Sequence, residues 1–421
     1  MPGLLSINNY NYRRGGAEVV FLEHNRLLSE RGWQISRFAM SHPKNYQDAD
    51  QDLFASEIEF GENYSLTQKL INASRVLYSF EAQSRIAQVI ERRSPDIAHA
   101  HNIYHHLSPA IFPTIKRAGI PAVLTLHDLK LACPAYTMRT GNAVCERCKG
   151  GRIENVIYQR CIKGSLPLST VIFFESALHR ILGLYANNVD KFVVPSRFLM
   201  NKLIEWGWPE DRFEYIPNFV DCRTHPFSPD IGEGFIYFGR LSHEKGIATL
   251  LQAAAKAKQP LTIVGTGPQD AEMKAMAQEL GIDAKFLGYK TGDDLHKAIH
   301  AARAVVLPST WYENAPLTIL EANALGRPVI GAQIGGIPEM IRHGQTGLTF
   351  PSGDADALAD CLTQLATMPN HQLREMSREG RRWMEQEFSP SAYIARNLSL
   401  YESLGVSAAT MQANHSVHAT C

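Results

Sequence analysis

Two carboxylates, Glu313 and Glu321, stand within one short stretch of the chain. The apolar run before them predicts a buried parallel strand that ends at Leu307, and Pro316 suits the first turn of a helix that follows. Glu321 would then lie about 12 Å beyond Glu313, at about 1.5 Å per residue. At that separation the two carboxylates could accept hydrogen bonds from the hydroxyl groups of two different sugars in one long ligand.

The start of this predicted helix supplies backbone amides without an acceptor inside the helix, and such amides bind phosphate without a metal ion. The two carboxylates could instead be ordinary solvated acids. Glu321 argues against that alternative, because it lies within an apolar helix, where a buried carboxylate needs a partner. The residues expected at this anion site are Asn314, Ala315, Pro316 and Leu317.

A second loop carries positive charge. It follows a predicted strand at 235–238 and places Gly239, Arg240 and Lys245 together. Two cations on a strand-to-helix loop can neutralise a diphosphate without a metal ion, although surface cations are common at such places. We therefore expect a diphosphate contact here.

The second half alternates strands and helices regularly, which indicates a doubly wound parallel sheet. Loops after two of its strands would let the backbone approach a ligand at Gly265, Gly267 and Tyr289. They do not complete a Gly-x-Gly-x-x-Gly motif, so a nicotinamide dinucleotide is not indicated. The strands are expected at 235–238, 261–264, 285–287, 304–307 and 328–330.

The N-terminal half offers weaker signals. Gly15 and Gly16 form a turn at the mouth of a predicted helix, where a diphosphate could bind, although most such pairs only shape a turn. His127 ends a predicted strand at 122–126, and open α/β sheets bind ligands at the carboxyl ends of their strands. A strand-end histidine is nevertheless most often structural. A neighbouring cluster, expected to consist of satisfied loop or cleft-wall side chains, contains His99, His101, His105 and His106.

Four cysteines follow, separated by eleven, two and twelve residues. A Cys-x-x-Cys flanked by two further cysteines is typical of a tetrahedral zinc site, and four thiolates would make that site structural rather than catalytic. The alternative is a set of free thiols in an irregular insertion. These residues are Cys133, Cys145, Cys148 and Cys161.

The pattern from Pro308 to Ile330, Pro-Ser-x-x-x-Glu-x-x-Pro-Leu-x-x-x-Glu-Ala-x-Ala-x-Gly-x-Pro-Val-Ile, resembles the signature of the retaining GT-B glycosyltransferases. More narrowly, it is similar to the group 1 family that builds bacterial surface polysaccharides. The resemblance implies that Glu313 contacts the donor sugar and Glu321 the donor ribose. It further implies that His127 lies close to the transferred sugar, with Asp128 as an orienting or acceptor group.

The same resemblance covers two further motifs, Gly-Arg-Leu-x-x-x-Lys-Gly at 239–246 and Gly-Gly-Ala-Glu at 15–18. For the first motif it implies diphosphate binding by Arg240 and Lys245. It implies an α/β protein of GT-B architecture, with two Rossmann-like domains facing a central cleft. The expected organisation is an N-terminal acceptor-side domain at 1–213 with a cysteine-containing insertion at 129–165, a C-terminal nucleotide-sugar-binding domain at 214–388, a terminal helix at 389–405 that crosses back, and a disordered tail at 406–421.

The expected function is retaining transfer of a hexose from a UDP- or GDP-hexose to a glycan or lipid-linked acceptor, in exopolysaccharide or lipopolysaccharide biosynthesis. No cofactor is expected for catalysis, and a structural zinc ion is the one metal considered. Asp48, Asp50 and Asp52 repeat the Asp-x-Asp pattern of another glycosyltransferase architecture, but we expect solvated loop acids there. The alternatives are a GT-B sugar-nucleotide epimerase or phosphorylase, a non-catalytic polysaccharide-assembly partner, and a zinc-dependent binding module.

The 421 residues suggest two domains, and a formal net charge of zero argues against a nucleic-acid binder. Neither a signal peptide nor an apolar run of about 18 residues is evident, so we expect a cytoplasmic protein, at most peripheral to the inner membrane. A helix predicted at 169–186 contains Phe173, Phe174 and Ile181. Its expected role is in the core, with a membrane-facing helix as the alternative, because periodicity does not separate the two.

Overall fold

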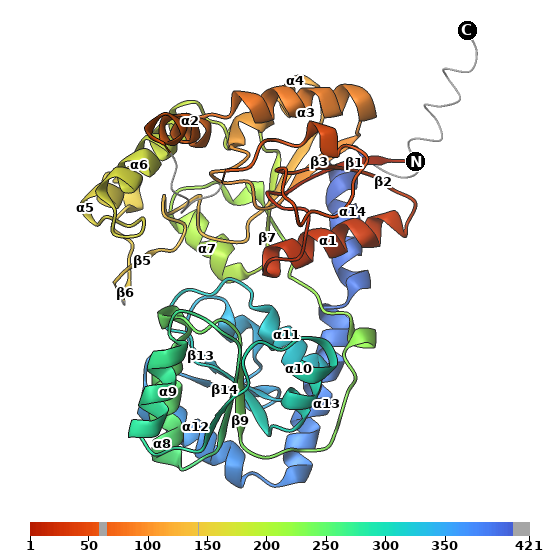
Figure 1. Ribbon diagram of the computed structural model, residues 1–421. Helices are drawn as coiled ribbons and strands as arrows, with labels where there is room; N and C mark the ends of the chain where they lie inside the picture. The colour runs from red at the N-terminus through yellow and green to blue at the C-terminus, as the bar shows by residue number, and fades with distance from the viewer. Residues whose placement is uncertain (59–64, 142, 407–421) are drawn as a thin grey trace.

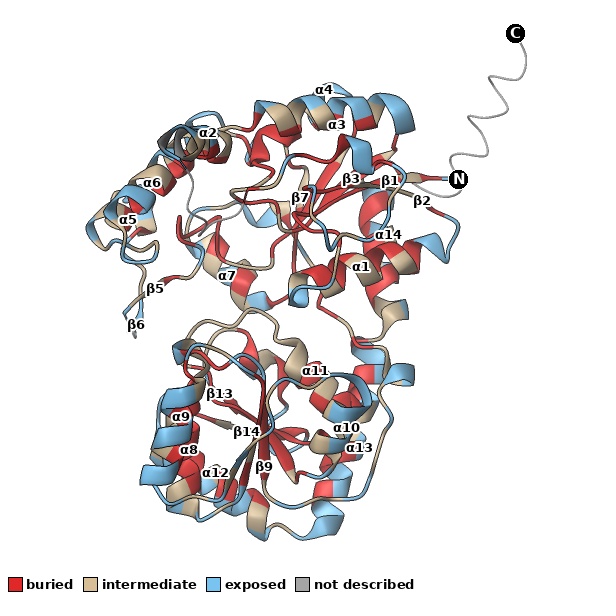
Figure 2. Ribbon diagram, viewed as in Figure 1, coloured by how far each residue is buried: buried red, intermediate tan, exposed pale blue. Residues whose placement is uncertain are grey.

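The computed structural model describes residues 1–58, 65–141 and 143–406. Two parallel sheets form the centres of two domains (Figure 1). The N-terminal sheet has the order β2-β1-β3-β4-β7-β8, and the C-terminal sheet has the order β11-β10-β9-β12-β13-β14. Helices cover these sheets, so the central strands are buried and read as short apolar runs (Figure 2).

The N-terminal domain surrounds the strands β1 Gly3–Ile7, β2 Gln34–Phe38, β3 Ile97–Ala100, β4 Ala122–Thr125, β7 Lys191–Val194 and β8 Phe213–Tyr215. Its helices are α1 Gly16–Ser29, α2 Leu66–Leu77, α3 Phe80–Arg93, α4 Phe112–Arg117, α5 Asn155–Tyr158, α6 Leu166–Ile181 and α7 Arg197–Glu205. The insertion at 129–165 contains α5 and a small antiparallel pair, β5 Arg139–Thr140 and β6 Ala143–Val144. All of these insertion elements lie at one edge of the domain (Figure 1).

The C-terminal domain surrounds the strands β9 Phe235–Phe238, β10 Leu261–Val264, β11 Ala284–Phe286, β12 Ala304–Leu307, β13 Val329–Ala332 and β14 Gly347–Phe350. Its helices are α8 Ile247–Ala257, α9 Asp270–Glu279, α10 Gly292–His300, α11 Leu317–Ala324, α12 Ala355–Thr367 and α13 Asn370–Glu387. The loops with the candidate residues follow the carboxyl ends of β9, β10, β11 and β12. Because these strands are parallel, the loops lie at the same edge of the sheet.

Three of the five strands predicted in this half, at 235–238, 261–264 and 304–307, match the structure residue for residue. The other two differ by a residue or two at their ends. The sequence did not predict β2 or β14, which are short and carry polar residues. The strand β8 pairs with β7 up to Tyr215, so the N-terminal sheet extends past the expected domain boundary at 213.

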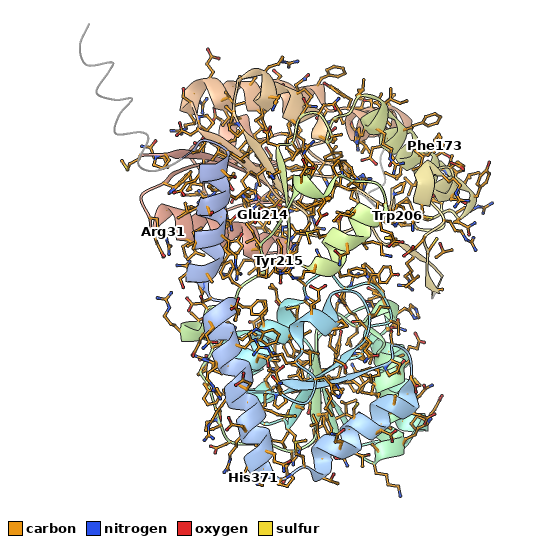
Figure 3. The ribbon with its side chains drawn as sticks, turned by 180° about the vertical axis from the view of Figure 1, so that it is seen from behind. Arg31, Phe173, Trp206, Glu214, Tyr215 and His371 are labelled. Carbon is orange, nitrogen blue, oxygen red and sulfur yellow. The ribbon has the colours of Figure 1, made fainter. Side chains whose placement is uncertain are left out.

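The last helix, α14 Pro390–Ser403, packs against α1 of the N-terminal domain. Its Tyr393 and Tyr401 hydroxyls lie 3.0 Å from Nδ1 and Nε2 of His24, respectively. The helices α13 and α14 therefore run along the back of both domains, from His371 to the region near Arg31 (Figure 3). Val406, the first residue of the expected tail, is buried in the N-terminal domain, and 407–421 lie outside the described residues. In the described part of the chain, no helix has the length and apolar character needed to cross a membrane.

Two of the three Asp-x-Asp acids are not solvated as expected, whereas Asp52 is exposed as predicted and pairs with Arg92. Asp50 is buried, and its carboxylate contacts the guanidinium groups of Arg92 and Arg93. Asp48 lies 3.0 Å from Arg37. The sequence could not reveal these pairs, because the arginines come from distant segments. Their role is structural.

Candidate active site

The centre of the candidate site is an ion pair between Lys245 and Glu313. Lys245 Nζ lies 2.6 Å from Glu313 Oε1, and Ser309 Oγ donates a hydrogen bond of 2.8 Å to the same oxygen. Lys245 precedes α8, whereas Ser309 and Glu313 belong to the loop between β12 and α11. The structure therefore brings together two residues that the sequence placed on separate loops. Both side chains are partly exposed, at 26% and 15%, so a ligand can reach them.

Asn314 joins this loop to the N-terminal domain. Its Nδ2 donates to the backbone carbonyl of Leu126 at 3.1 Å, and its Oδ1 accepts a hydrogen bond of 2.6 Å from Ser196 Oγ. Leu126 directly precedes His127, and Asn314 directly follows Glu313. One hydrogen bond thus fixes the two predicted cleft residues beside each other. The Asn314 side chain holds the domains together, a role that the sequence did not suggest.

The helix α11 begins one residue later than expected. Pro316 is its N-cap residue, in an extended conformation, and Leu317 is the first helical residue. No side chain of the described residues caps this end. The carbonyl of Ala315 accepts a hydrogen bond of 3.0 Å from Asn218. The first turn of α11 therefore keeps backbone amides for an anion.

Glu321 lies in α11 and lines a cavity of about 1090 Å³ between the two domains. Burial raises the pKa of Glu321 from 4.5 to about 7. No described residue contributes an ion pair or a hydrogen bond to its carboxylate. A buried carboxylate without a protein partner can accept hydrogen bonds from ligand hydroxyl groups, which would replace the hydrogen bonds to water that it lost on burial.

The same cavity contains further predicted residues. From the N-terminal domain come Gly15 and the neighbouring Arg13 and Arg14, and from the C-terminal domain come Leu317 and the exposed Tyr289. A Cβ atom on Gly16 would lie 3.6 Å from Leu317 Cδ1, in van der Waals contact, so the starts of α1 and α11 meet beside the cavity. Lys245, Glu313, Arg240 and His127 do not line this cavity.

Arg13 and Arg14 are functional candidates that the sequence reasoning missed. Both line the cavity, and Arg14 stacks its guanidinium over the ring of Tyr10 at 4.3 Å. The signal was present, because these two cations directly precede the glycine pair at the start of α1. They add positive charge to the N-terminal wall of the cavity.

The loops after β9 and β10 pack tightly against each other. Gly265 has φ +134°, and a Cβ atom there would lie 1.9 Å from the carbonyl oxygen of Gly239. A Cβ atom on Gly267 would similarly clash with the carbonyl of Leu241. Arg240 is exposed beside these loops. Burial raises the pKa of Tyr136 of the N-terminal domain, and the positive charge of Arg240 opposes that rise, so Arg240 acts electrostatically on the other domain.

A row of histidine rings lies behind His127. The ring of His101 stacks on His127 at 5.4 Å and on His99 at 4.8 Å, and His101 Nδ1 lies 3.1 Å from His127 Nε2. His99 Nδ1 in turn lies 2.6 Å from the Tyr401 hydroxyl of α14. Burial lowers the pKa of His127 to about 4, so its imidazole is neutral near pH 7. The neighbouring Asp128 has a pKa raised by burial to about 6.

A second contact between the domains also escaped the sequence reasoning. The Glu339 carboxylate accepts hydrogen bonds from the backbone amides of Arg197, at 2.8 Å, and Phe198, so it caps the start of α7. On the far side of the cleft, Arg139 of the insertion lies 3.0 Å from Glu244. These contacts hold the two domains in the arrangement that brings the site residues together.

The four cysteines of the insertion are free thiols in one region. Burial raises the pKa of Cys148 to about 12, and the proximity of Cys133, Cys161 and Cys145 adds to that rise. Their sulfur atoms are not closely gathered. Among the described residues, the one group of three potential ligands within 4.8 Å of one another is formed by His24, His99 and His101.

The comparisons with known proteins agree with this geometry. Residues 227–383 match the family described as glycosyl transferases group 1, and residues 14–224 match glycosyltransferase family 4. The N-acetyl-alpha-D-glucosaminyl L-malate synthase of Bacillus anthracis is 24% identical over 405 residues, which cover 92% of this chain and 93% of that protein. The amylovoran biosynthesis glycosyltransferase AmsK of Erwinia amylovora is 28% identical over 202 residues, 44% of this chain and 49% of that protein.

Solved structures show the same fold. Sucrose-phosphate synthase from Thermosynechococcus elongatus has a TM-score of 0.69 at 20% identity, covering 96% of this chain and 99% of that chain. Anabaena HepE, solved with UDP and glucose, has a TM-score of 0.65 at 17% identity, covering 96% and 100%.

Two Rossmann-like domains that face a central cleft are the GT-B architecture, and this fold is the one expected from the sequence. The chain belongs to glycosyltransferase family 4, in which the C-terminal half carries the group 1 domain. It is a glycosyltransferase.

Proposed function

We propose that the protein transfers a hexose from a nucleoside diphosphate sugar to an acceptor hydroxyl, with retention at the anomeric carbon and without a metal ion. The observation that carries this proposal is the Lys245–Glu313 pair, held at the start of α11 by Ser309. A cation and a carboxylate at a free helix start suit a sugar diphosphate, whose phosphates need positive charge and whose sugar needs hydroxyl acceptors.

In this proposal Arg240, Lys245 and the first amides of α11 stabilise the diphosphate as negative charge develops on it. The Glu313 carboxylate accepts hydrogen bonds from the hexose, and Glu321 accepts them from the ribose. Gly15 and Gly16 approach the diphosphate from the N-terminal domain. The neutral imidazole of His127, held by His101, would lie beside the transferred sugar and donate or accept a hydrogen bond there.

We propose departure and attack on the same face of the sugar. A double displacement would need a free carboxylate as nucleophile, whereas Glu313 is already engaged by Lys245 and Ser309. In the same-face reaction the bond between the anomeric carbon and the phosphate oxygen breaks, and the acceptor oxygen bonds to that carbon. The departing phosphate oxygen takes the acceptor proton.

The donor nucleotide and the acceptor are proposed from relatives. HepE was solved with UDP-glucose, which favours a UDP-hexose, with a GDP-hexose as the second choice. The AmsK relative acts in amylovoran biosynthesis by its name, which supports a glycan or lipid-linked acceptor in exopolysaccharide or lipopolysaccharide assembly at the inner membrane. The Bacillus anthracis relative is named for L-malate, so a small hydroxy acid is the second candidate acceptor.

We also propose that the four cysteines of the insertion hold a structural zinc ion. The Cys-x-x-Cys spacing and the presence of all four thiols in one region of the insertion support this. Binding would require the sulfur atoms to draw together, with each thiol giving up its proton. No catalytic step depends on this ion.

The experiment that tests the transferase proposal incubates the protein with UDP- and GDP-hexoses and candidate acceptors, with EDTA present, and follows the anomeric protons by NMR. An α-linked donor should give an α-linked product. A β-linked product would contradict retention, and a trapped glycosyl-enzyme adduct would contradict the same-face reaction. An epimerised donor in the absence of acceptor would favour the epimerase instead.

A further inference from the structure

The helix α6 departs from the usual pattern of a surface helix, because several of its polar residues are buried and two of its large apolar residues are exposed, although Ile172 joins the core. Ser169, Glu175, Ser176 and His179 are buried. Phe174 and Ile181 are exposed, at 56% and 81% of their surfaces. The expectation that these two residues belong to the core is wrong. Figure 2 shows exposed turns of α6 at the edge of the N-terminal domain.

The inner face of α6 fixes this orientation through buried polar contacts. Glu175 Oε2 accepts a hydrogen bond of 2.7 Å from Lys130 Nζ, and Glu175 Oε1 lies 2.9 Å from His105 Nδ1. His179 Nε2 lies 2.8 Å from the backbone carbonyl of Leu77 in α2. Breaking a buried ion pair of this kind is costly, so the helix cannot rotate its apolar side into the domain.

The outer face of α6 carries two large exposed apolar side chains. Phe174 and Ile181 are seven residues apart, so they lie two turns apart on one side of the helix. The Phe173 ring packs edge-to-face on Phe174 at 5.3 Å, and Figure 3 shows Phe173 at the outer edge of the domain. Further exposed apolar side chains of α6 and of the adjoining α5 and C-cap are Tyr158, Leu166, Leu168 and Leu182. We call these residues together the α6 surface.

Two cations lie beside the α6 surface. Arg160 and Lys163 are exposed before α6. Arg180, near the end of α6, is also exposed, but it lines a pocket together with Cys148 and His179. No ion pair joins any of the three to an acid among the described residues. Between residues 155 and 182 the sequence has one acidic residue, Glu175, which is buried beneath the helix. The exposed part of this segment is therefore apolar and positively charged.

We propose that the α6 surface docks the protein on an anionic phospholipid bilayer, with Phe174 and Ile181 entering the interface and with Arg160 and Lys163 contacting lipid headgroups. Aromatic and aliphatic side chains beside unpaired Lys and Arg residues are the combination that such an interface selects. A protein partner with an apolar face would not explain the absence of exposed acids over this segment. The inference does not depend on the identity of the donor or on the transfer reaction.

The test is co-sedimentation of the full chain with vesicles of phosphatidylcholine alone and of phosphatidylcholine with phosphatidylglycerol. We expect clear binding to the anionic vesicles, weak binding to the neutral ones, and release as the salt concentration rises. Phe174→Ser with Ile181→Ser should weaken binding about tenfold or more, because two interfacial side chains are lost. The matched control is Leu280→Ser, at an exposed leucine of the other domain, which should bind as wild type.

A second pair of variants tests the charges. Arg160→Gln with Lys163→Gln should weaken binding to anionic vesicles about tenfold, whereas Lys258→Gln with Lys285→Gln, at exposed lysines of the C-terminal domain, should not. All of these positions are exposed, and circular dichroism melting curves should match wild type. Equal binding by wild type and the Phe174/Ile181 variant would overturn the proposal. A concentration-dependent dimer that this variant abolishes would also overturn it, because the surface would then be an interface between copies of the chain.

Discussion

The carboxyl group of Glu321 provides a prediction whose size follows from the structure. Burial raises its pKa from 4.5 to about 7, so the folded protein disfavours the charged form. Between those two pH values the folded state holds a proton that the unfolded state has released. The free energy of unfolding therefore falls as the pH rises through this window, and the cost is complete above pH 7. The difference between 4.5 and 7 corresponds to about 3 kcal/mol as an upper value.

The perturbation is Glu321→Gln, which keeps the shape of the side chain and removes its titration. The pH-dependent part of the stability gain should be under about 1 kcal/mol at pH 5 and should approach about 3 kcal/mol at pH 8. The assay is urea unfolding at both pH values, followed by tryptophan fluorescence, since Trp311 and Trp383 lie in the same domain. The matched control, Glu279→Gln, alters an exposed acid at the end of α9.

The same variant should bind the nucleotide sugar about tenfold more weakly, because a hydrogen bond to a charged group contributes about 1.5 to 3 kcal/mol. Gain in stability together with loss of affinity would show that the carboxylate is retained for the ligand. If Glu321→Gln and Glu279→Gln depend on pH in the same way, the reasoning about burial is refuted. If stability rises as expected but affinity is unchanged, the ribose contact is refuted.

Three further predictions concern other parts of the molecule. His127→Ala should lower kcat about 100-fold with little change in donor affinity, and a loss of donor affinity alone would contradict its place beside the sugar. In the wild type, kcat should not change between pH 6 and 8 through titration of His127, because the pKa of His127 is lowered to about 4. Tyr401→Phe should lower the free energy of unfolding by about 2 to 4 kcal/mol, as measured by urea unfolding. The reason is that a ring nitrogen of His24 and one of His99 lose the hydroxyl group that lies 3.0 Å and 2.6 Å from them, respectively. An unchanged unfolding midpoint would contradict a stabilising role of this hydroxyl group. Wild-type protein purified from zinc-supplemented culture should carry about one zinc ion per chain by elemental analysis, and the Cys148→Ser variant should carry much less. Wild-type protein without bound zinc would refute the zinc proposal.

The sequence was sufficient for the features that depend on local pattern. Apolar runs located the strands β9, β10 and β12; the loop after β9 carries Arg240 and Lys245, and the loop after β12 carries Glu313. In a parallel sheet such loops must gather at one edge, so the proximity of these residues could be predicted without knowing the packing. The glycines at the tight turns also indicated where backbones approach each other, as Gly265 does with Gly239.

The features that depend on contacts between distant segments could not be predicted. Asn314 is predicted to bind the donor, which stays a prediction, and the contacts of its side chain with Leu126 and Ser196 of the other domain could not be foreseen. Asp50 was expected in solvent, but two arginines more than forty residues later enclose it. Phe174 and Ile181 are expected in the core because apolar residues usually face it, whereas the buried contacts of Glu175 turn another side of α6 inward. In each case the partner lies far along the chain, where periodicity carries no information.

The central claim is that a nucleotide sugar binds between the charged loops of the C-terminal domain without a metal ion. The most direct measurement is a thermal shift of wild type, Arg240→Ala and the control Lys285→Ala with UDP-, GDP- and ADP-sugars, first with EDTA and then with magnesium. A ligand at 100 times its Kd should stabilise the native state by about 2.7 kcal/mol. We predict a shift with one nucleotide class, equal with and without magnesium, kept in Lys285→Ala and lost in Arg240→Ala. A shift that needs magnesium, one that survives in Arg240→Ala, or no shift with any nucleotide would contradict it.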